Sequence, residues 1–272
     1  MSRHDVTDRE WNTIRKYLPK QRSGKRGRPW ADHRSVVNGI LWVLGVGGSW
    51  RDVPVAYGKW QTIYNRFRRW VNEGLWDRIW SRLVRKMDQR KKVGRKLWSI
   101  DGTVIRAHRT AAGGSRKSER NGEENALGRS RGGYSTKIHV VCEGKGIPLG
   151  VTLTSGEKGE APEFPNAMTS TPIGIHRKSK RPKAVAGDKA YSSKAIRSWL
   201  RSRGIKDVIP RRSNERRTPR FSKQLYKQRN VVERLIGRLK DFRRIATRYD
   251  KTKESYLAMI KIAFLRITLK MI

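Results

Sequence analysis

The segment Leu97-Trp98-Ser99-Ile100-Asp101-Gly102-Thr103-Val104-Ile105 decides the fold, because it is an apolar run that contains one acidic residue. Its length and its β-branched residues predict a buried β-strand. A carboxylate inside such a strand is unfavourable unless it is paired, hydrogen-bonded or bound to a metal. We therefore expect Asp101 to be a functional residue.

The chain that follows this strand alternates between short apolar runs and helical periods. This alternation predicts an open α/β sheet, in which functional sites lie at the ends of strands. The fourth predicted strand stops at Asp188, so we expect this second acid to lie near Asp101. The alternative is that Asp188 only caps the helix that begins at about Ser192. The predicted strands cover residues 97–105, 134–142, 148–154, 183–187 and 206–210, and the predicted helices between them cover residues 161–168 and 192–203.

A later helix carries a third acid among cations. Tyr226, Arg229, Glu233 and Lys240 fall within an arc of roughly 60° on a continuous α-helix. A carboxylate flanked by cations suits a metal ion that lies next to a polyanion. The alternatives are that Tyr226 only packs in the core and that the two cations only face solvent. The opposite side of this helix is an apolar stripe suited to a core, made of Val231, Val232, Leu235, Ile236, Leu239 and Phe242.

The N-terminal third predicts helices only. Thr7 and Glu10 form a capping box that opens the first helix, and the helix that begins at about Lys59 has one apolar and one polar side. The polar side is typical of a DNA-binding helix-turn-helix, which reads base edges and phosphates. The alternative is a helical bundle with a solvated basic face. Further helices are expected at residues 34–44 and 75–87, and the outward residues of the DNA-binding helix are Gln61, Asn65, Arg66 and Arg69.

These patterns predict two domains. Residues 1–95 are expected to form a helical DNA-binding domain, and residues 96–272 a catalytic domain that ends in an amphipathic helix at residues 255–271. Between the first two strands of the second domain lies a long basic segment, residues 108–133, which we expect to be a DNA-wrapping loop or, equally well, a plain linker. Its Arg129 and Arg131 are candidate DNA contacts.

The charge of the chain points to nucleic acid. The 64 Lys and Arg residues against 23 Asp and Glu residues give a formal net charge of +41, which favours binding to phosphate backbones. A membrane surface is the weaker interpretation, because the basic residues are spread along the whole chain. No apolar run is long enough to span a bilayer, the first residues lack the apolar core of a signal peptide, and the single Cys142 excludes an internal disulfide. We expect a cytoplasmic, nucleoid-associated protein.

Three acids placed on these elements suggest a metal site. In a chain of net charge +41, a cluster of Asp101, Asp188 and Glu233 needs a reason, because unneutralised like charges raise one another's pKa values. Two divalent ions about 4 Å apart would provide it, as in two-metal phosphoryl transfer. Oxygen ligands favour Mg²⁺ or Mn²⁺ over zinc.

The chain resembles the DDE transposases of bacterial insertion sequences, and in particular the insertion-sequence-five family. The spacing Tyr226-x2-Arg229-x3-Glu233-x6-Lys240 matches the motif of these enzymes, and the resemblance covers nearly the whole chain. Its other motifs are Gly39-Ile40-Leu41-Trp42-Val43-Leu44, Trp50-Arg51-Asp52-Val53-Pro54, Tyr57-Gly58-Lys59-Trp60-Gln61-Thr62, Ser99-Ile100-Asp101-Gly102-Thr103, Gly128-Arg129-Ser130-Arg131-Gly132-Gly133, Gly187-Asp188-Lys189-Ala190-Tyr191 and Arg243-Arg244-Ile245-Ala246-Thr247-Arg248-Tyr249-Asp250.

This resemblance implies an α/β, ribonuclease-H-like catalytic core behind an N-terminal all-helical DNA-binding domain. It also implies the catalytic and metal-binding triad Asp101, Asp188 and Glu233, which would cleave the ends of the element and join them to target DNA. Tyr226, Arg229 and Lys240 would contact DNA beside the reacting bond, and at least a homodimer on DNA is expected. One departure is that many relatives have His-Asp after the third strand, where this chain has Gly159-Glu160.

Other classes of protein remain open at this stage. A DNA-binding regulator without catalysis would need the helix-turn-helix and the charge, but not the three acids. A ribosomal or RNA-binding protein would also account for the charge, but not for acids at strand ends. A structure-specific nuclease would share the acids without transferring strands.

Overall fold

The computed structural model describes residues 2–21, 30–112, 125–130, 132–175, 177–215 and 221–271. Its N-terminal region is all-helical, as expected, and the capping box of Thr7 and Glu10 is formed. Glycine ends the second helix, where Gly47 has a left-handed backbone with φ of 73°. The helical elements of this region are α1 (Asp8–Ile14), η1 (Arg15–Tyr17), α2 (His33–Val46), η2 (Trp50–Asp52), η3 (Val55–Tyr57), α3 (Trp60–Asn72) and α4 (Leu75–Gln89).

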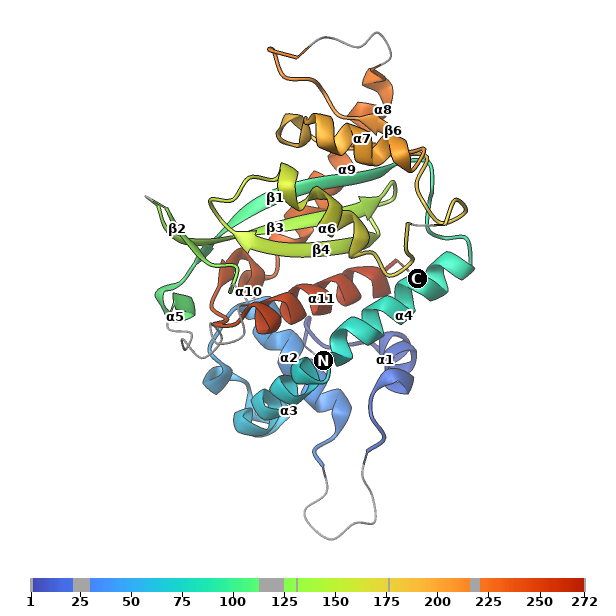
Figure 1. Ribbon diagram of the computed structural model, residues 1–272. Coiled ribbons are helices and arrows are strands. Elements are labelled where there is room, and N and C mark those ends of the chain that lie inside the picture. The colour runs from blue at the N-terminus through green and yellow to red at the C-terminus, as the bar shows by residue number, and fades with distance from the viewer. Residues whose placement is uncertain are drawn as a thin grey trace.

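A seven-stranded sheet forms the second part of the molecule (Figure 1). Its strands are β1 (Trp98–Ala107), β2 (Gly128–Ser130), β3 (Gly133–Glu143), β4 (Pro148–Ser155), β5 (Ala184–Ala186), β6 (Lys206–Val208) and β7 (Thr247–Arg248). The five main strands lie in the order β4-β3-β1-β5-β6, with β1, β3 and β4 antiparallel and β1, β5 and β6 parallel. This is the ribonuclease-H-like order, so the expected fold class is confirmed.

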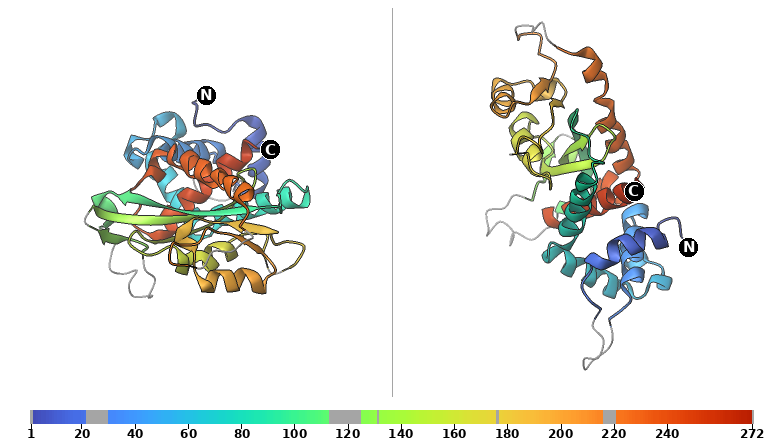
Figure 2. Two further views of the ribbon diagram at one scale, coloured as in Figure 1. Left: turned by 90° about the horizontal axis from the view of Figure 1, so that it is seen from above. Right: turned by 90° about the vertical axis from the view of Figure 1, so that its right-hand side faces the viewer.

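Helices cover both faces of this sheet (Figure 2). On one face lie α9 (Asn230–Lys240), α10 (Arg243–Ala246) and α11 (Lys253–Leu269), together with the N-terminal helices. On the other face lie α6 (Phe164–Thr169) and α7 (Lys194–Ser202). Shorter elements are α5 (Arg109–Ala112), η5 (Ala161–Glu163), η6 (Lys189–Tyr191) and α8 (Lys223–Lys227).

The last helix, α11, is buried on nearly all sides. Its sequence was expected to be amphipathic, and this expectation is wrong. The helix packs against α2, α3 and α4 on one side and against β4 and α9 on the other, so most of its residues, including Tyr256 and Phe264, are buried. A helix enclosed in this way is apolar over most of its surface.

The N-terminal helices and the sheet share one hydrophobic core, which includes residues of both regions. Polar contacts also join the two regions. Arg266 of α11 pairs with Glu10 of α1, and Arg244 of α10 donates a hydrogen bond to the carbonyl oxygen of Gly48 at 3.1 Å. The division into two domains between residues 95 and 96 stays a prediction. The hydrophobic core is continuous across this boundary.

The basic segment 108–133 is not entirely without secondary structure. Residues 109–112 form α5, and residues 128–130 form β2, which pairs with the start of β3. Residues 113–124 and Arg131 lie outside the described part of the chain. Among the described residues, no helix is long and apolar enough to cross a membrane.

Candidate active site

Asp101 lies on β1, the central strand of the sheet. Its Oδ1 atom accepts a hydrogen bond from the backbone N–H of Gly102 at 2.9 Å. Burial raises the pKa of its carboxyl group, and the nearby Arg229 guanidinium counteracts part of this shift. The carboxylate found by its place in an apolar run is therefore compensated by a cation, as the physical argument requires.

Asp188 follows the end of β5, which is parallel to β1 and adjacent to it. It caps η6, because its Oδ1 atom accepts a hydrogen bond from the N–H of Ala190 at 2.9 Å. The following helix, α7, is capped by Ser193 instead. Asp188 is thus both a local cap and a neighbour of Asp101, since its charge contributes to raising the pKa of Asp101.

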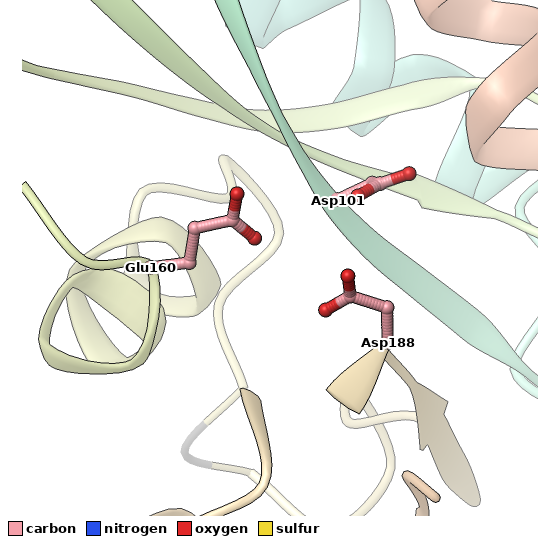
Figure 3. Close-up of side chains that lie close together, drawn as sticks. All are labelled: Asp101, Glu160 and Asp188. Carbon is pink, nitrogen blue, oxygen red and sulfur yellow. The ribbon is translucent and has the colours of Figure 1, made fainter. Parts of the chain in front are cut away.

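Glu160 is the third member of this group. One carboxylate oxygen from each of Asp101, Glu160 and Asp188 lies within 4.8 Å of the others, and Figure 3 shows the three side chains gathered beside β1. Glu160 comes from the turn that leads into η5 and α6. Its sequence signal was the Gly159-Glu160 departure from the family pattern, which marked the position without indicating that it would meet the other two acids.

Gly102 makes room for Glu160. A Cβ atom at position 102 would lie 2.7 Å from Oε1 of Glu160, closer than real Cβ contacts. Glu160 has a second near neighbour in Lys137, whose Nζ atom is 3.8 Å from the same oxygen. Burial and the charge of Asp188 raise the pKa of Glu160, while Lys137 opposes the shift.

Tyr191 lines the buried side of the acidic group. Its side chain is 0% exposed, and burial, with the charge of Glu160 next, raises the pKa of its phenol well above the usual value. The hydroxyl group is near enough to interact with Glu160 but is not aligned for a regular hydrogen bond to any described residue. It therefore offers the acidic group a polar neighbour that cannot carry a negative charge near neutral pH.

Glu233 is placed differently from the other acids. It lies in the first turn of α9 with an exposed side chain, and among the described residues it is not part of the close group of three. Arg229 connects it to that group, because this guanidinium pairs with Glu233 and also lies 3.0 Å from Oδ2 of Asp101. The catalytic assignment of Glu233 stays a prediction.

The continuous helix expected for Tyr226 to Lys240 is wrong, because it is broken into α8 and α9. Residues 228 and 229 form a tight turn in which the N–H of Arg229 bonds to the carbonyl of Tyr226 at 2.9 Å. A hydrogen bond between residues three apart winds the chain more tightly than an α-helix does. Residues before and after this turn therefore do not keep the angular positions that a continuous α-helix would give them. Tyr226 packs on Phe221, with ring centroids 5.5 Å apart, while Lys240 is exposed at the end of α9.

The expected outward face of α3 is only partly exposed. Gln61, Asn65 and Arg69 face solvent. The expected exposure of Arg66 is wrong: its side chain is buried, lies 4.2 Å from the centroid of the Trp30 ring and hydrogen-bonds with His33 at 3.0 Å.

The roles proposed for the exposed α3 residues stay predictions, and so does that of Arg129, which is exposed on β2. The role proposed for Arg131 falls outside the described residues.

The acidic group fits a divalent cation. Its three carboxylates supply the hard oxygen ligands that Mg²⁺ and Mn²⁺ prefer. The Oε2 atom of Glu160 is buried and has no hydrogen-bond partner among the described residues, so a ligand position is free. A cation would also relieve the repulsion that contributes to the raised pKa values of Asp101 and Glu160.

Comparisons with known proteins identify the family of this chain. A family model described as "Transposase DDE domain" matches residues 93–267, and one described as "Putative transposase of IS4/5 family" matches residues 6–80. The match to the first model makes the protein a nucleic-acid-processing enzyme. The chain belongs to the DDE transposases, and within them to the IS4/5 family, which confirms the resemblance carried by its motifs.

Individual relatives are similar over parts of the chain. An uncharacterized protein y4sN of Sinorhizobium fredii is 36% identical over 111 residues, which are 41% of this chain and 83% of that protein. A putative transposase for insertion sequence element IS6501 of Brucella ovis is 28% identical over 138 residues, or 50% and 99% of the two chains. Among solved structures, a chain of a pre-cleavage Mos1 transpososome is 12% identical with a TM-score of 0.28, covering 92% of this chain and 82% of that one.

Proposed function

We propose that this transposase binds the terminal inverted repeats of its element, cleaves DNA at the ends by metal-dependent hydrolysis, and joins the freed 3′-hydroxyl ends to target DNA. The observation that carries the proposal is the meeting of Asp101, Glu160 and Asp188 beside β1. In a chain with a net charge of +41, this acidic group is suited to a cation that acts on a phosphodiester held by basic surroundings.

Asp101, Asp188 and Glu233 would hold two Mg²⁺ or Mn²⁺ ions, with Glu160 as a further ligand. Bound ions of this kind activate the attacking oxygen and stabilise the charge that develops on the leaving oxygen. Glu233 is exposed and pairs with Arg229, and rotation about its side-chain bonds is the change that would bring its carboxylate to the metal. Repulsion from the other carboxylates would oppose this rotation unless a cation is bound among them.

Arg229 would change partners when DNA and metal bind. In the free protein it neutralises Asp101 and Glu233. Once those carboxylates bind a metal, its guanidinium becomes available for a phosphate of the DNA, for which its planar donors are well suited. Lys240 would contact a phosphate further along the same side, and Tyr226 would lie against the terminal nucleotide.

DNA recognition would fall to the N-terminal helices. Gln61, Asn65 and Arg69 are exposed on α3 and carry the amide and guanidinium groups that read base edges and phosphates. A homodimer would hold the two ends of an element together, and the DNA partner would place the protein with the bacterial nucleoid.

A strand-transfer assay tests this function. The protein is incubated with labelled duplexes that carry the inverted repeats flanking its reading frame, with a target plasmid and with Mg²⁺. Joined products are expected with the wild-type protein and not with Asp188→Ala. The matched control is Asp241→Ala, which removes an exposed carboxylate at the end of α9 and should leave joining unchanged.

The alternatives give different results in the same assay. Cleavage without joining would indicate a nuclease, and DNA binding without chemistry in either protein would indicate a regulator and end the enzyme proposal. Joining that survives in Asp188→Ala would remove this carboxylate from the catalytic site.

A further inference from the structure

A second cavity lies at the far end of β1 from the acidic group. Its volume is about 510 Å³, and it lies between the η2–α3 segment of the N-terminal region and the α10–α11 segment of the C-terminal region. Seven residues of extended chain separate Asp101 from His108, which lines the cavity; at the rise of a β-strand this is about 23 Å. The cavity is therefore separate from the proposed catalytic site.

Aromatic rings form much of its wall. Trp50 and Tyr64 have ring centroids 5.4 Å apart, and His108 and Tyr249 have ring centroids 5.2 Å apart at an interplanar angle of 35°. Trp60, at the start of α3, is a further lining residue. None of these five rings is fully buried, so the cavity offers flat apolar surfaces to a ligand that enters from solvent.

Cations surround these rings. Arg51, Arg68 and Lys251 line the cavity and are exposed, and the described residues include no carboxylate that forms an ion pair with them. The guanidinium of Arg51 lies 5.7 Å from the centroid of the Trp60 ring. The rim of the cavity is thus positive next to an aromatic surface.

Among the described residues that line this cavity, the one carboxylate is already neutralised. Asp250 is buried and accepts two hydrogen bonds from Arg244, both at 3.2 Å. Arg244 is held in turn by the carbonyl oxygen of Gly48. Asp250 therefore positions Arg244 instead of repelling an anion, and the charge of the lining is positive overall.

We propose that this cavity binds one nucleotide of a DNA strand whose base is unstacked from its neighbours. Aromatic side chains stack on bases of any sequence, and cations beside them bind the phosphates on either side. The proposal deepens the transposase function and rests on it for the identity of the DNA. It assigns a role to two motifs that the acidic site does not use, because Trp50 and Arg51 of one motif and Arg244, Tyr249 and Asp250 of the other line this cavity.

Photocrosslinking tests the proposal without catalysis. A short oligothymidylate with one 5-iodo-2′-deoxyuridine is bound to the Asp188→Ala protein in EDTA, irradiated and mapped by peptide mass spectrometry. Crosslinks to Trp60, Tyr64, His108 or Tyr249 are expected. Crosslinks that map only to other residues would overturn the proposal.

Binding of the same oligonucleotide to variants gives a second measurement. Loss of one stacking ring in Trp60→Ala or His108→Ala should weaken binding about 10-fold. The matched control is Trp199→Ala, which removes a ring that stacks with Arg203 on α7, on the other face of the sheet. Equal affinities in the wild type and the three variants would contradict the proposal, provided that circular dichroism shows each variant to be folded.

Free nucleotides are the other source of the same chemistry. Thymidine monophosphate is added as a competitor for the bound oligonucleotide. At equal concentration the oligonucleotide should stay bound, because only a strand also contacts the cations on both sides of the base. Displacement of the oligonucleotide by equimolar monophosphate would show a mononucleotide site and overturn the assignment to DNA. Crosslinking at the cavity together with no strand transfer by the wild-type protein would support the nucleotide-binding cavity and reject the proposed transposase reaction.

Discussion

A guanidinium nitrogen of Arg229 lies 3.0 Å from a carboxylate oxygen of Asp101, although 128 residues separate them in the sequence. The same guanidinium pairs with Glu233. A cation of the protein thus occupies the space between two acids that are expected to bind metal. It opposes the rise in the pKa of Asp101 that burial causes, and it also competes with any metal for both carboxylates.

This competition predicts that Arg229→Gln binds Mn²⁺ more tightly in the absence of DNA. Removal of one partly buried ion pair should change the affinity by about fivefold, or ~1 kcal/mol, while strand cleavage falls because a phosphate contact is lost. Titration calorimetry with Mn²⁺ measures the first effect. Arg234→Gln, on the exposed side of α9, is the control, and weaker Mn²⁺ binding in Arg229→Gln would mean that Arg229 organises the ligands instead.

Gly102→Ala should displace the Glu160 carboxylate, because the new Cβ would lie 2.7 Å from Oε1. The clash is with the end of a side chain, so the protein should stay folded and Mn²⁺ binding should weaken. Gly237→Ala is the matched control, since a Cβ there meets nothing within 4 Å; in a helix interior it should stabilise the protein by ~0.5–1 kcal/mol. Unchanged metal affinity in Gly102→Ala would remove Glu160 from the ligand set.

Glu160→Gln should raise the melting temperature in EDTA. The pKa of Glu160 is raised by burial and by Asp188, so its ionised form destabilises the folded state at neutral pH, and this destabilisation disappears as pH falls through the raised pKa. The difference between variant and wild type should therefore be largest near neutral pH and shrink in acid. Glu163→Gln changes a half-buried residue whose carboxylate accepts a hydrogen bond from Asn166 and should show no such trend.

His139 should make the protein sensitive to acid. Its ring is fully buried and donates or accepts a hydrogen bond at 2.9 Å with Thr154, and burial lowers its pKa from 6.5 to about 4. Because the unfolded chain takes up the proton first, stability falls as pH drops from 6.5 towards 4, by about 3 kcal/mol in total. Urea unfolding at several pH values gives the free energy of unfolding as a function of pH. This free energy should change less with pH in His139→Gln than in the wild type, and an equal pH dependence in the two proteins would contradict the assignment.

The shared core around α11 predicts one unfolding transition for the whole chain. Phe264, at the centre of this helix, contacts Trp80 of α4 with ring centroids 5.5 Å apart. Phe264→Ala should cost about 3–5 kcal/mol and lower the melting of the N-terminal helices and the sheet together. Differential scanning calorimetry that resolves two transitions would show instead that the two regions unfold independently.

Much of the fold could be predicted from periodicity. The strands around Asp101 and the apolar side of α9 follow local alternation and helical spacing, which the structure reproduces. The break at Arg229 and the burial of α11 could not be predicted in this way. The break accompanies a tertiary contact between the Arg229 side chain and Asp101. The burial of α11 depends on two surfaces that enclose this one helix.

Two of the three acids could be predicted because they lie on or just after recognisable strands, Asp101 within β1 and Asp188 after β5. Asp101 and Asp188 meet because β1 and β5 are adjacent and parallel. Glu160 lies in an irregular turn after β4, where no period indicates a direction, and its meeting with Asp101 depends on the missing side chain of Gly102. Arg66 shows the same limit on α3, since its burial depends on tertiary contacts with the Trp30 ring and with His33.

The enclosure of α11 has a consequence for the DNA of the element itself. Because this helix joins the N-terminal helices to the sheet through one continuous core, the proposed function implies a fixed distance between a repeat bound by α3 and a bond cut beside Asp101. The number of base pairs between the recognised sequence and the end of the element is then set by the protein. An element that gained or lost base pairs in that interval would no longer be a substrate of its own enzyme.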